Sequence, residues 1–192
     1  MDIWSFLAER FDLPILDWIA ANLWCPFLDA VMPVITVLGD AGIFWIAVAV
    51  VLLFIPKYRK IGLSMGAALL MGVLLCNVTL KPLVGRIRPY DYQLEHFGKT
   101  IQLLIPAQHD YSFPSGHTIA SFEAAVAIVL RNRKLGIPAM VLAVLIAFSR
   151  LYLYVHYPTD VLASMVLGTA LALLGTWLVN KGYGLYEKKK LQ

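Results

Sequence analysis

Two histidines and an aspartate have the residue types and the spacing of a site for phosphoryl transfer. His156 and Asp160 are four residues apart, so on a helical turn their side chains lie on one face. The carboxylate can accept the proton of one imidazole nitrogen, which leaves the other nitrogen with a lone pair that can attack phosphorus. His117 begins a separate apolar segment, from where it could protonate a leaving oxygen as a general acid.

The cations near these residues predict that the ligand is a phosphate. Lys81, Arg88 and Arg150 stand near the ends of apolar segments. Guanidinium groups offer paired donors to phosphate oxygens, whereas Lys offers a point charge. The hydroxyl of Ser115 and the backbone amide of Gly116, at the start of a predicted helix, add neutral donors and the helix dipole.

The segments that carry these residues are apolar and long, as in a membrane protein. The 192-residue chain is 60% hydrophobic and 15% charged, whereas soluble domains are roughly 45–50% apolar and about 25% charged. In lipid the backbone must satisfy its own hydrogen bonds, so each apolar run is predicted to be a helix of ~20 residues. We therefore predict an all-α, polytopic membrane helical bundle with five spans, at residues 41–56, 61–80, 113–130, 135–149 and 161–180.

Residues 1–39 are predicted to form an N-terminal interfacial arm rather than a further span. Ile3, Phe6, Leu7 and Phe11 recur at helical spacing, with polar residues that include Asp12 on the opposite face, the pattern of an amphipathic helix in the membrane interface. A sixth span over residues 18–38 is the alternative, and it would hold the carboxylate of Asp29 at mid-bilayer at a cost of ~3 kcal/mol. No cleavable signal peptide is expected.

Basic clusters predict the orientation in the membrane. They lie between the first and second spans, between the third and fourth, and after the fifth, at residues 57–60, 131–134 and 188–190. All three clusters therefore share one side, which the positive-inside rule makes cytoplasmic, together with the C-terminus. The arm, the connection 81–113 and the turn around residues 150–160 then lie on the extracytoplasmic side. We expect one membrane-embedded domain, 1–192, with the bundle at 41–180 and an outer catalytic loop at 81–113.

Three motifs complete a family signature. The chain resembles the type 2 phosphatidic acid phosphatase superfamily, whose signature is K-x6-RP, then PSGH, then SR-x5-H-x3-D; the matching stretches are Lys81 to Pro89, Pro114 to His117 and Ser149 to Asp160. The resemblance implies that His156 is the nucleophile and forms a phosphohistidine, that Asp160 orients and activates it, and that His117 is the general acid. It also implies that the phosphoryl oxygens are held by Lys81, Arg88, Ser115, Gly116 and Arg150.

The expected activity is metal-independent hydrolysis of a lipid phosphate or diphosphate. Fixed cations and amides can stabilise the charge of a phosphoryl transition state, and the sequence has no Asp-rich metal cluster, so we expect no metal and no other cofactor. The compact frame resembles bacterial enzymes that act on undecaprenyl diphosphate, a cell-wall lipid carrier, which is the favoured substrate. Phosphatidic acid and phosphatidylglycerol phosphate are the alternatives, because the motifs bind phosphate and not the tail. Membrane lipids are expected around the protein, nucleic acid is not expected as a partner, and the oligomeric state stays open.

Two other classes of protein fit part of the sequence less well than a lipid phosphatase does. Vanadate-dependent haloperoxidases share the phosphate-binding motifs, but those relatives are soluble and larger, and the five apolar runs argue against them. A transporter or a structural membrane protein could also carry intramembrane charge; here Glu123 is the ionisable residue at depth, so no charged path crosses the bilayer. Glu123 is either functional or packs against the bundle. Arg86 lies between the motif positions, suits lipid headgroups as well as substrate, and is placed outside the predicted catalytic set.

Overall fold

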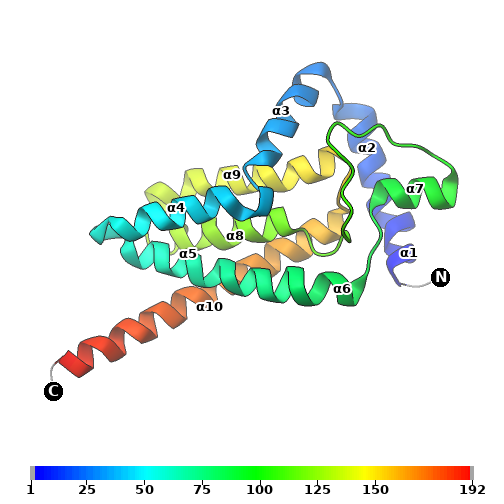
Figure 1. Ribbon diagram of the computed structural model, residues 1–192. Coiled ribbons are helices and arrows are strands. Elements are labelled where there is room, and N and C mark those ends of the chain that lie inside the picture. The colour runs from blue at the N-terminus through cyan, green and yellow to red at the C-terminus, as the bar shows by residue number, and fades with distance from the viewer. Residues whose placement is uncertain (1–2, 191–192) are drawn as a thin grey trace.

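The computed structural model describes residues 3–190, except for the side chain of Lys189, and within this range the chain is helical and has no strand. The bundle helices lie alongside one another (Figure 1). They are α4 (Ile43–Phe54), α5 (Arg59–Gly72), α8 (Gly116–Val129), α9 (Arg133–Tyr152) and α10 (Pro158–Lys190). The prediction of an all-α fold is therefore confirmed.

The apolar helices make this a multi-pass membrane protein. Among residues 3–190, four helical stretches are long and apolar enough to cross a membrane: Pro26–Phe54, Pro56–Phe97, Arg133–Tyr152 and Pro158–Lys188. The counterpart of the predicted span 113–130 is α8, which is apolar but has 14 residues. At 1.5 Å per residue it is about 21 Å long, shorter than a typical hydrocarbon core.

Helix α8 lies at the centre of the bundle and packs against α9, α10 and α5. Small side chains allow this close packing, as is common between helices in membranes. Ala124 and Ala127 of α8 are fully buried. On α10, a Cβ at Gly168 would lie 2.8 Å from the Ile119 carbonyl oxygen, and one at Gly175 would lie 3.0 Å from that of Ser64. The two glycines therefore let α10 approach the backbones of α8 and α5.

Two of the three basic clusters, at residues 57–60 and 131–134, meet at one end of the bundle, where α4 turns into α5 through a short 3-10 helix, η3 (Pro56–Tyr58), and α8 turns into α9 (Figure 1). Lys57, Arg59, Lys60 and Arg131 line one surface depression there. Arg131 ties this end together, because its guanidinium donates to Asn180 at 2.8 Å. The turn between α9 and α10 lies at the opposite end, as the alternation of spans predicts.

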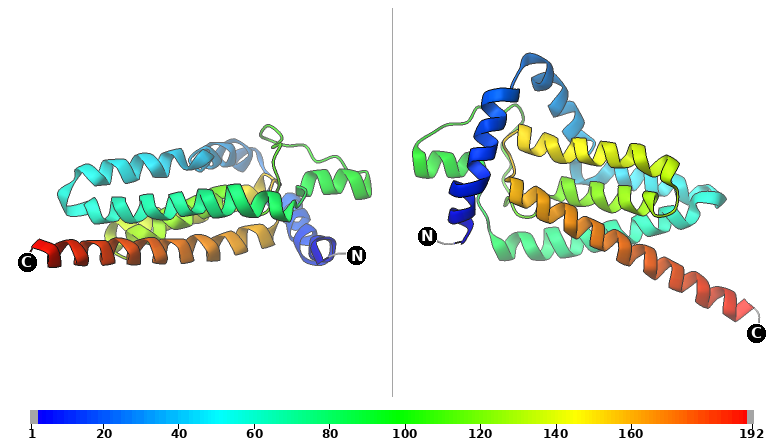
Figure 2. Two further views of the ribbon diagram at one scale, coloured as in Figure 1. Left: turned by 60° about the horizontal axis from the view of Figure 1, so that its bottom comes forward. Right: turned by 180° about the vertical axis from the view of Figure 1, so that it is seen from behind.

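The N-terminal segment lies across that opposite end (Figure 2). It consists of α1 (Ile3–Leu7), a π-helical turn η1 (Ala8–Asp12) and α2 (Leu13–Leu23), which follow one another without a break. Ile3, Phe6 and Phe11 are exposed, as an apolar face toward the membrane interface would be. The helical periodicity predicts that Asp12 lies on the polar face, but in the structure Asp12 is fully buried against the protein.

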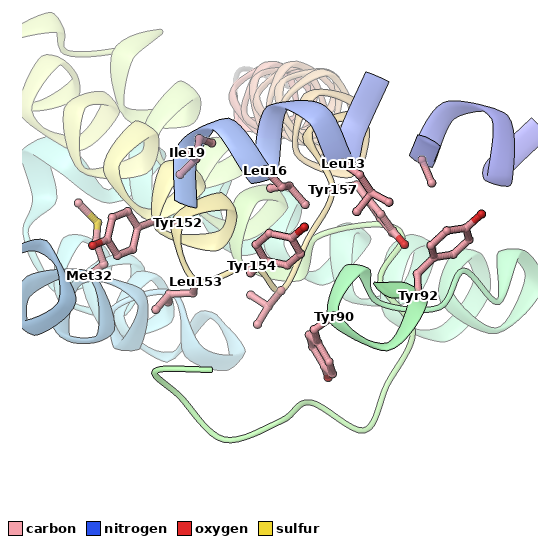
Figure 3. Close-up of a cluster of buried hydrophobic side chains, with 12 residues drawn as sticks. Leu13, Leu16, Ile19, Met32, Tyr90, Tyr92, Tyr152, Leu153, Tyr154 and Tyr157 are labelled. Carbon is pink, nitrogen blue, oxygen red and sulfur yellow. The ribbon is translucent and has the colours of Figure 1, made fainter. Parts of the chain in front are cut away.

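A tyrosine-rich hydrophobic cluster attaches this segment to the bundle (Figure 3). Leu13, Leu16 and Ile19 of α2 are buried within it. Its other labelled members come from α3 (Pro26–Val37), from α7 (Pro89–Phe97) and from the α9–α10 turn region: Met32, Tyr90, Tyr92, Tyr152, Leu153, Tyr154 and Tyr157. The cluster thus packs the N-terminal segment over the end of the bundle that carries the third motif.

Helix α3 leads back toward the bundle. The chain is extended at Trp24 and Cys25, and the apolar stretch that starts at Pro26 runs through α3 into α4, so it begins earlier than the predicted first span. Asp29 accepts a hydrogen bond from the Tyr152 hydroxyl at 2.6 Å, which places it at the end of α9. The interfacial position of residues 1–39 stays a prediction.

Candidate active site

His156 lies in the turn between α9 and α10, under the N-terminal segment. The turn contains Tyr154 with φ +60°, a left-handed conformation that costs a residue with a Cβ roughly 1–2 kcal/mol. Buried contacts hold it: the Tyr154 hydroxyl donates to Asp17 at 3.0 Å and accepts from Gln93 at 2.8 Å. The turn therefore presents His156 in one orientation, with its side chain almost completely buried.

Asp160 lies beside His156, as predicted, but the two do not share a helical turn, because His156 precedes the first residue of α10. Pro158 begins α10, a position that suits proline because its missing N–H would have no helical partner. Asp160 is then the third residue of the helix, and its carboxylate accepts the backbone N–H of Tyr157 at 3.1 Å, as in a capping box. Its Oδ2 is 3.6 Å from His156 Nδ1. The pair is in contact, at a distance longer than a hydrogen bond.

The other nitrogen of His156 faces the cations of the first motif. Arg88 donates to the carbonyl oxygen of Val155 at 2.7 Å, and the same nitrogen, Nη1, is 3.4 Å from His156 Nε2. Burial lowers the pKa of His156 well below its usual value, and the charges of Arg88, Arg150 and Lys81 lower it further. The imidazole is therefore neutral at physiological pH, so a ring nitrogen carries a free lone pair.

A carboxylate forms ion pairs with the cations of the first motif. Lys81, at the start of α6 (Lys81–Val84), and Arg88 both bind Asp110 from the loop after α7. Burial alone would raise the pKa of Asp110, but the hydrogen bonds and charges of Lys81 and Arg88 outweigh this effect and lower it to about 2. The two cations thus hold an anionic group between them, and Asp110 is a site residue that the motifs did not reveal.

Arg150 and His117 complete the group of polar side chains. Arg150 is buried, donates to the Thr36 hydroxyl at 2.5 Å, and lies 3.3 Å from His117 Nε2. Its Nε has no hydrogen-bond partner among the described residues. Because an unpaired buried donor is costly, this guanidinium is suited to bind an anion. His117, the second residue of α8, also contacts Asp40, with 2.7 Å between Nε2 and Oδ1.

Ser115 and Gly116 occupy different positions in the site. Gly116 lines the cavity beside the cations. Ser115 is fully buried, and its backbone N–H donates to the Ser164 hydroxyl at 2.9 Å while its own hydroxyl accepts from Thr118 at 3.0 Å. The structure therefore brings Gly116 to the cavity wall and holds Ser115 in hydrogen bonds with α8 and α10.

The site forms one end of a cavity of about 480 Å³. Its polar end is lined by Lys81, Arg88, His117, Arg150 and His156. The remaining wall lies mainly between α4 and α5 and is largely apolar, with Ile46, Val50, Leu70 and Val73 among its residues. These four side chains are also exposed or partly exposed on the membrane-facing surface. The cavity therefore connects a cationic pocket with a lipid-facing apolar groove.

Glu123 lies on the wall of this groove. It is almost fully buried, and its Oε1 has no hydrogen-bond partner within residues 3–190. A Cβ at Gly72 of α5 would lie 2.2 Å from that oxygen. Glu123 thus faces the bundle interior, which is one of the two alternatives that the sequence left open. The absence of a side chain at Gly72 makes room for its carboxyl group.

Arg86 has a role in the structure, although it was placed outside the predicted catalytic set. Its guanidinium is buried, pairs with Asp160 at 2.5 Å and with Asp12 at 2.7 Å, and stacks on the Tyr157 ring with 3.7 Å to the centroid. It therefore lies behind the site, against the partner of His156. Its position between two motif residues was the available signal. Asp12 lies 74 residues away from Arg86 in the sequence, and no sequence signal connected the two residues.

The chain is similar in sequence and in overall structure to known proteins. The family model described as the PAP2 superfamily matches residues 58–183. An undecaprenyl-diphosphatase of Sulfolobus acidocaldarius is 33% identical over 139 residues, which is 72% of this chain and 65% of that protein. The undecaprenyl-diphosphatase BcrC of Bacillus subtilis is 33% identical over 151 residues, 77% of this chain and 72% of its own length. The crystal structure of a PAP2-type phosphatidylglycerolphosphate phosphatase from Bacillus subtilis superposes with a TM-score of 0.69 at 28% identity, covering 93% of this chain and 92% of that one.

Proposed function

Because the chain belongs to the PAP2 superfamily, we propose that it is a lipid phosphatase that hydrolyses a lipid phosphate or diphosphate without a metal, through a phosphohistidine intermediate. The favoured substrate is undecaprenyl diphosphate, which would yield undecaprenyl phosphate; phosphatidylglycerol phosphate and phosphatidic acid are the alternatives. The observation that carries the proposal is the cavity, which has a neutral histidine among cations at one end and an apolar groove toward lipid at the other.

The first step is binding of the phosphate among Lys81, Arg88 and Arg150. The phosphate displaces Asp110 from the two cations that now hold it, and the unpaired Nε of Arg150 gains an acceptor. The Gly116 amide, at the start of α8, adds a further donor. The lipid tail follows the groove between α4 and α5, where an apolar chain is removed from water.

The second step is attack by His156. Its Nε2, beside Arg88, forms a bond to phosphorus while the bond from phosphorus to the leaving oxygen breaks, and His117 gives a proton to that oxygen. Asp160 stabilises the positive charge that develops on the His156 ring. Water then attacks the phosphohistidine and gives a proton to His117 as its oxygen bonds to phosphorus; the bond from phosphorus to His156 Nε2 breaks, its electron pair returns to that nitrogen, and inorganic phosphate leaves. The fixed cations supply the charge stabilisation that a metal ion gives in other phosphoryl-transfer enzymes.

The choice of undecaprenyl diphosphate among the lipids that an apolar groove could accept rests on similarity to relatives. Two relatives at 33% identity carry the name undecaprenyl-diphosphatase, and the groove wall that faces lipid is apolar. The solved structure that superposes on 93% of the chain is named for phosphatidylglycerolphosphate, which supports the alternative. The positive-inside rule places the basic end in the cytoplasm, so the site would act on headgroups at the extracytoplasmic face.

The test is release of inorganic phosphate in detergent from undecaprenyl diphosphate, phosphatidylglycerol phosphate and phosphatidic acid. We expect the highest kcat/KM with undecaprenyl diphosphate, and no release above background by a folded His156→Ala variant. Normal hydrolysis by that variant would rule out the mechanism. Vanadate should inhibit, because it resembles the phosphoryl transition state. Oxidation of bromide by the vanadate-loaded protein would instead assign it to the haloperoxidases.

A further inference from the structure

A carboxylate outside the three motifs lies against the ring of His117. Asp40 belongs to the short turn η2 (Asp40–Gly42) between α3 and α4, and its Oδ1 is 2.7 Å from His117 Nε2. The turn is built from two consecutive left-handed residues, Ala41 with φ +48° and Gly42 with φ +67°. Because a residue with a Cβ rarely adopts this conformation, the strained turn at Ala41 suggests that the position of Asp40 has a function.

Gly39 lets the ring lie close to this turn. A Cβ at Gly39 would be 2.7 Å from His117 Cδ2 and 2.9 Å from Ile146 Cγ2, so a larger residue would have to move the imidazole. The ring edge that carries Nε2 therefore rests on the turn, where Asp40 accepts its proton. Nδ1 has no hydrogen-bond partner among the described residues, which leaves it for the substrate.

We propose that Asp40 is a positioning residue for the general acid His117, with the substrate receiving its proton from Nδ1. The inference rests on the function proposed above. As the bond from His156 Nε2 to phosphorus forms, the bond to the leaving oxygen breaks and its electron pair stays with that oxygen. The oxygen takes the proton of His117 Nδ1. The ring is then neutral and keeps its Nε2 proton, bound to Asp40.

Asp40 also offsets the positive groups around His117. Arg150 of α9 is 3.3 Å from the same ring nitrogen, and the charges of Lys81 of α6 and Arg88 before α7 also act on the ring, whereas the neighbouring His156 is neutral. Positive neighbours disfavour the protonated imidazole that a general acid needs, whereas a carboxylate in contact favours it. Without Asp40, His117 would lose its proton at a lower pH.

The first test is the pH dependence of kcat for Asp40→Asn, measured by phosphate release between pH 5 and 9. We expect the alkaline limb to shift to lower pH by about one to two units, since an adjacent opposite charge has an effect of this size. The activity should fall at least tenfold at pH 8 and stay near that of the native protein at pH 5.5. A profile of unchanged shape, whatever its height, overturns the proposal.

The second test uses the leaving group. Phosphatidic acid must expel an alkoxide, which needs a proton, whereas undecaprenyl diphosphate expels a phosphate ester, a much better leaving group. Asp40→Asn should therefore slow the hydrolysis of phosphatidic acid at least fivefold more than that of undecaprenyl diphosphate, and Asp40→Glu should restore part of the loss. An equal reduction with both substrates would mean that Asp40 does not act through the general acid.

Two further variants separate this role from a general loss of structure. Asp29→Asn removes a carboxylate hydrogen bond of similar length, 2.6 Å to Tyr152, from the same segment and away from His117, and it should leave the pH profile unchanged. Gly39→Ala should displace the ring and lower kcat without changing Asp40. If the native protein releases no phosphate from any of the three lipids, the proposed function fails. If it is active but Asp40→Asn matches it at every pH, only the present inference fails.

Discussion

Replacement of Asp12 by Asn tests whether the N-terminal segment supports the site. The Asp12 carboxylate binds Arg86 at 2.7 Å and accepts from the backbone N–H and the hydroxyl of Thr159 at 2.9 and 2.7 Å. Arg86 in turn holds Asp160, the partner of His156. Both side chains of the Asp12–Arg86 pair are almost inaccessible, at 0% and 3% exposure. The substitution keeps the shape of residue 12 and removes its charge.

The expected loss follows from this burial. Removing one partner of a buried ion pair typically costs 3–5 kcal/mol, because the remaining charge is left without compensation. Here Arg86 keeps its bond to Asp160, so we expect about 3 kcal/mol, the lower end of that range. For a chain of this size, this corresponds to a fall in Tm of roughly 6–12 °C. We also expect kcat to fall about tenfold or more, because Asp160 loses part of its support, as for other partners behind a catalytic group.

Thermal unfolding in detergent and phosphate release measure the two effects. Lys99→Gln is the control, since it breaks an ion pair with Asp17 whose side chains are about half exposed. Such pairs contribute ~0–1 kcal/mol, so the Tm should change little. If Asp12→Asn melts and reacts like the native protein, the segment does not support the site and the reasoning is refuted. A lower Tm with unchanged kcat would limit the role of Asp12 to stability.

Three shorter predictions follow from other contacts. Asp110→Asn should lower the KM several-fold, because the neutral amide competes less with phosphate for the two cations that the carboxylate now binds; an unchanged KM would contradict this. Gly72→Ala should cost about 1–3 kcal/mol, because its Cβ would overlap the Glu123 carboxyl, and combining it with Glu123→Ala should recover most of the loss in thermal melts. Below about pH 6.5 the protein should become less stable, since the lowered pKa of His156 means that the unfolded chain takes up a proton which the folded one does not. The slope of Tm against pH between 7 and 5 should be smaller in His156→Gln.

Most of the site could be predicted from the sequence because its residues fall into three short motifs, each at the end of an apolar segment. Asp160 follows His156 by four residues, and the capping hydrogen bond that the Tyr157 amide donates to Asp160 is local. The alternation of spans also brings the basic clusters to one end and the motifs to the other, since consecutive membrane helices reverse direction. The all-α fold follows from the requirement that a backbone in lipid satisfies its own hydrogen bonds.

The residues that were missed depend on contacts between distant parts of the chain. Arg86 and Asp12 are separated by 74 residues, as are Arg86 and Asp160, and 77 residues separate Asp40 from His117. The residue types alone did not distinguish Arg86, Asp12 and Asp40 from ordinary surface charges. Helical periodicity placed Asp12 on the polar face of that arm, but a helix has a second buried face when it packs on protein instead of lying alone in the interface.

The sequence by itself determined the family and the helical fold, and it predicts the chemistry and the side of the membrane on which the site lies, because motif spacing and apolar segments act through local geometry and solvation. Only the tertiary structure decided which carboxylates meet which cations. Asp110 pairs with Lys81 and Arg88, Asp40 with His117, and Asp12 with Arg86. Each pair joins separate elements, so it forms only when the helices and the N-terminal segment have packed. The groove between α4 and α5 has the same origin, since its shape depends on how far apart two helices lie and not on the composition of either.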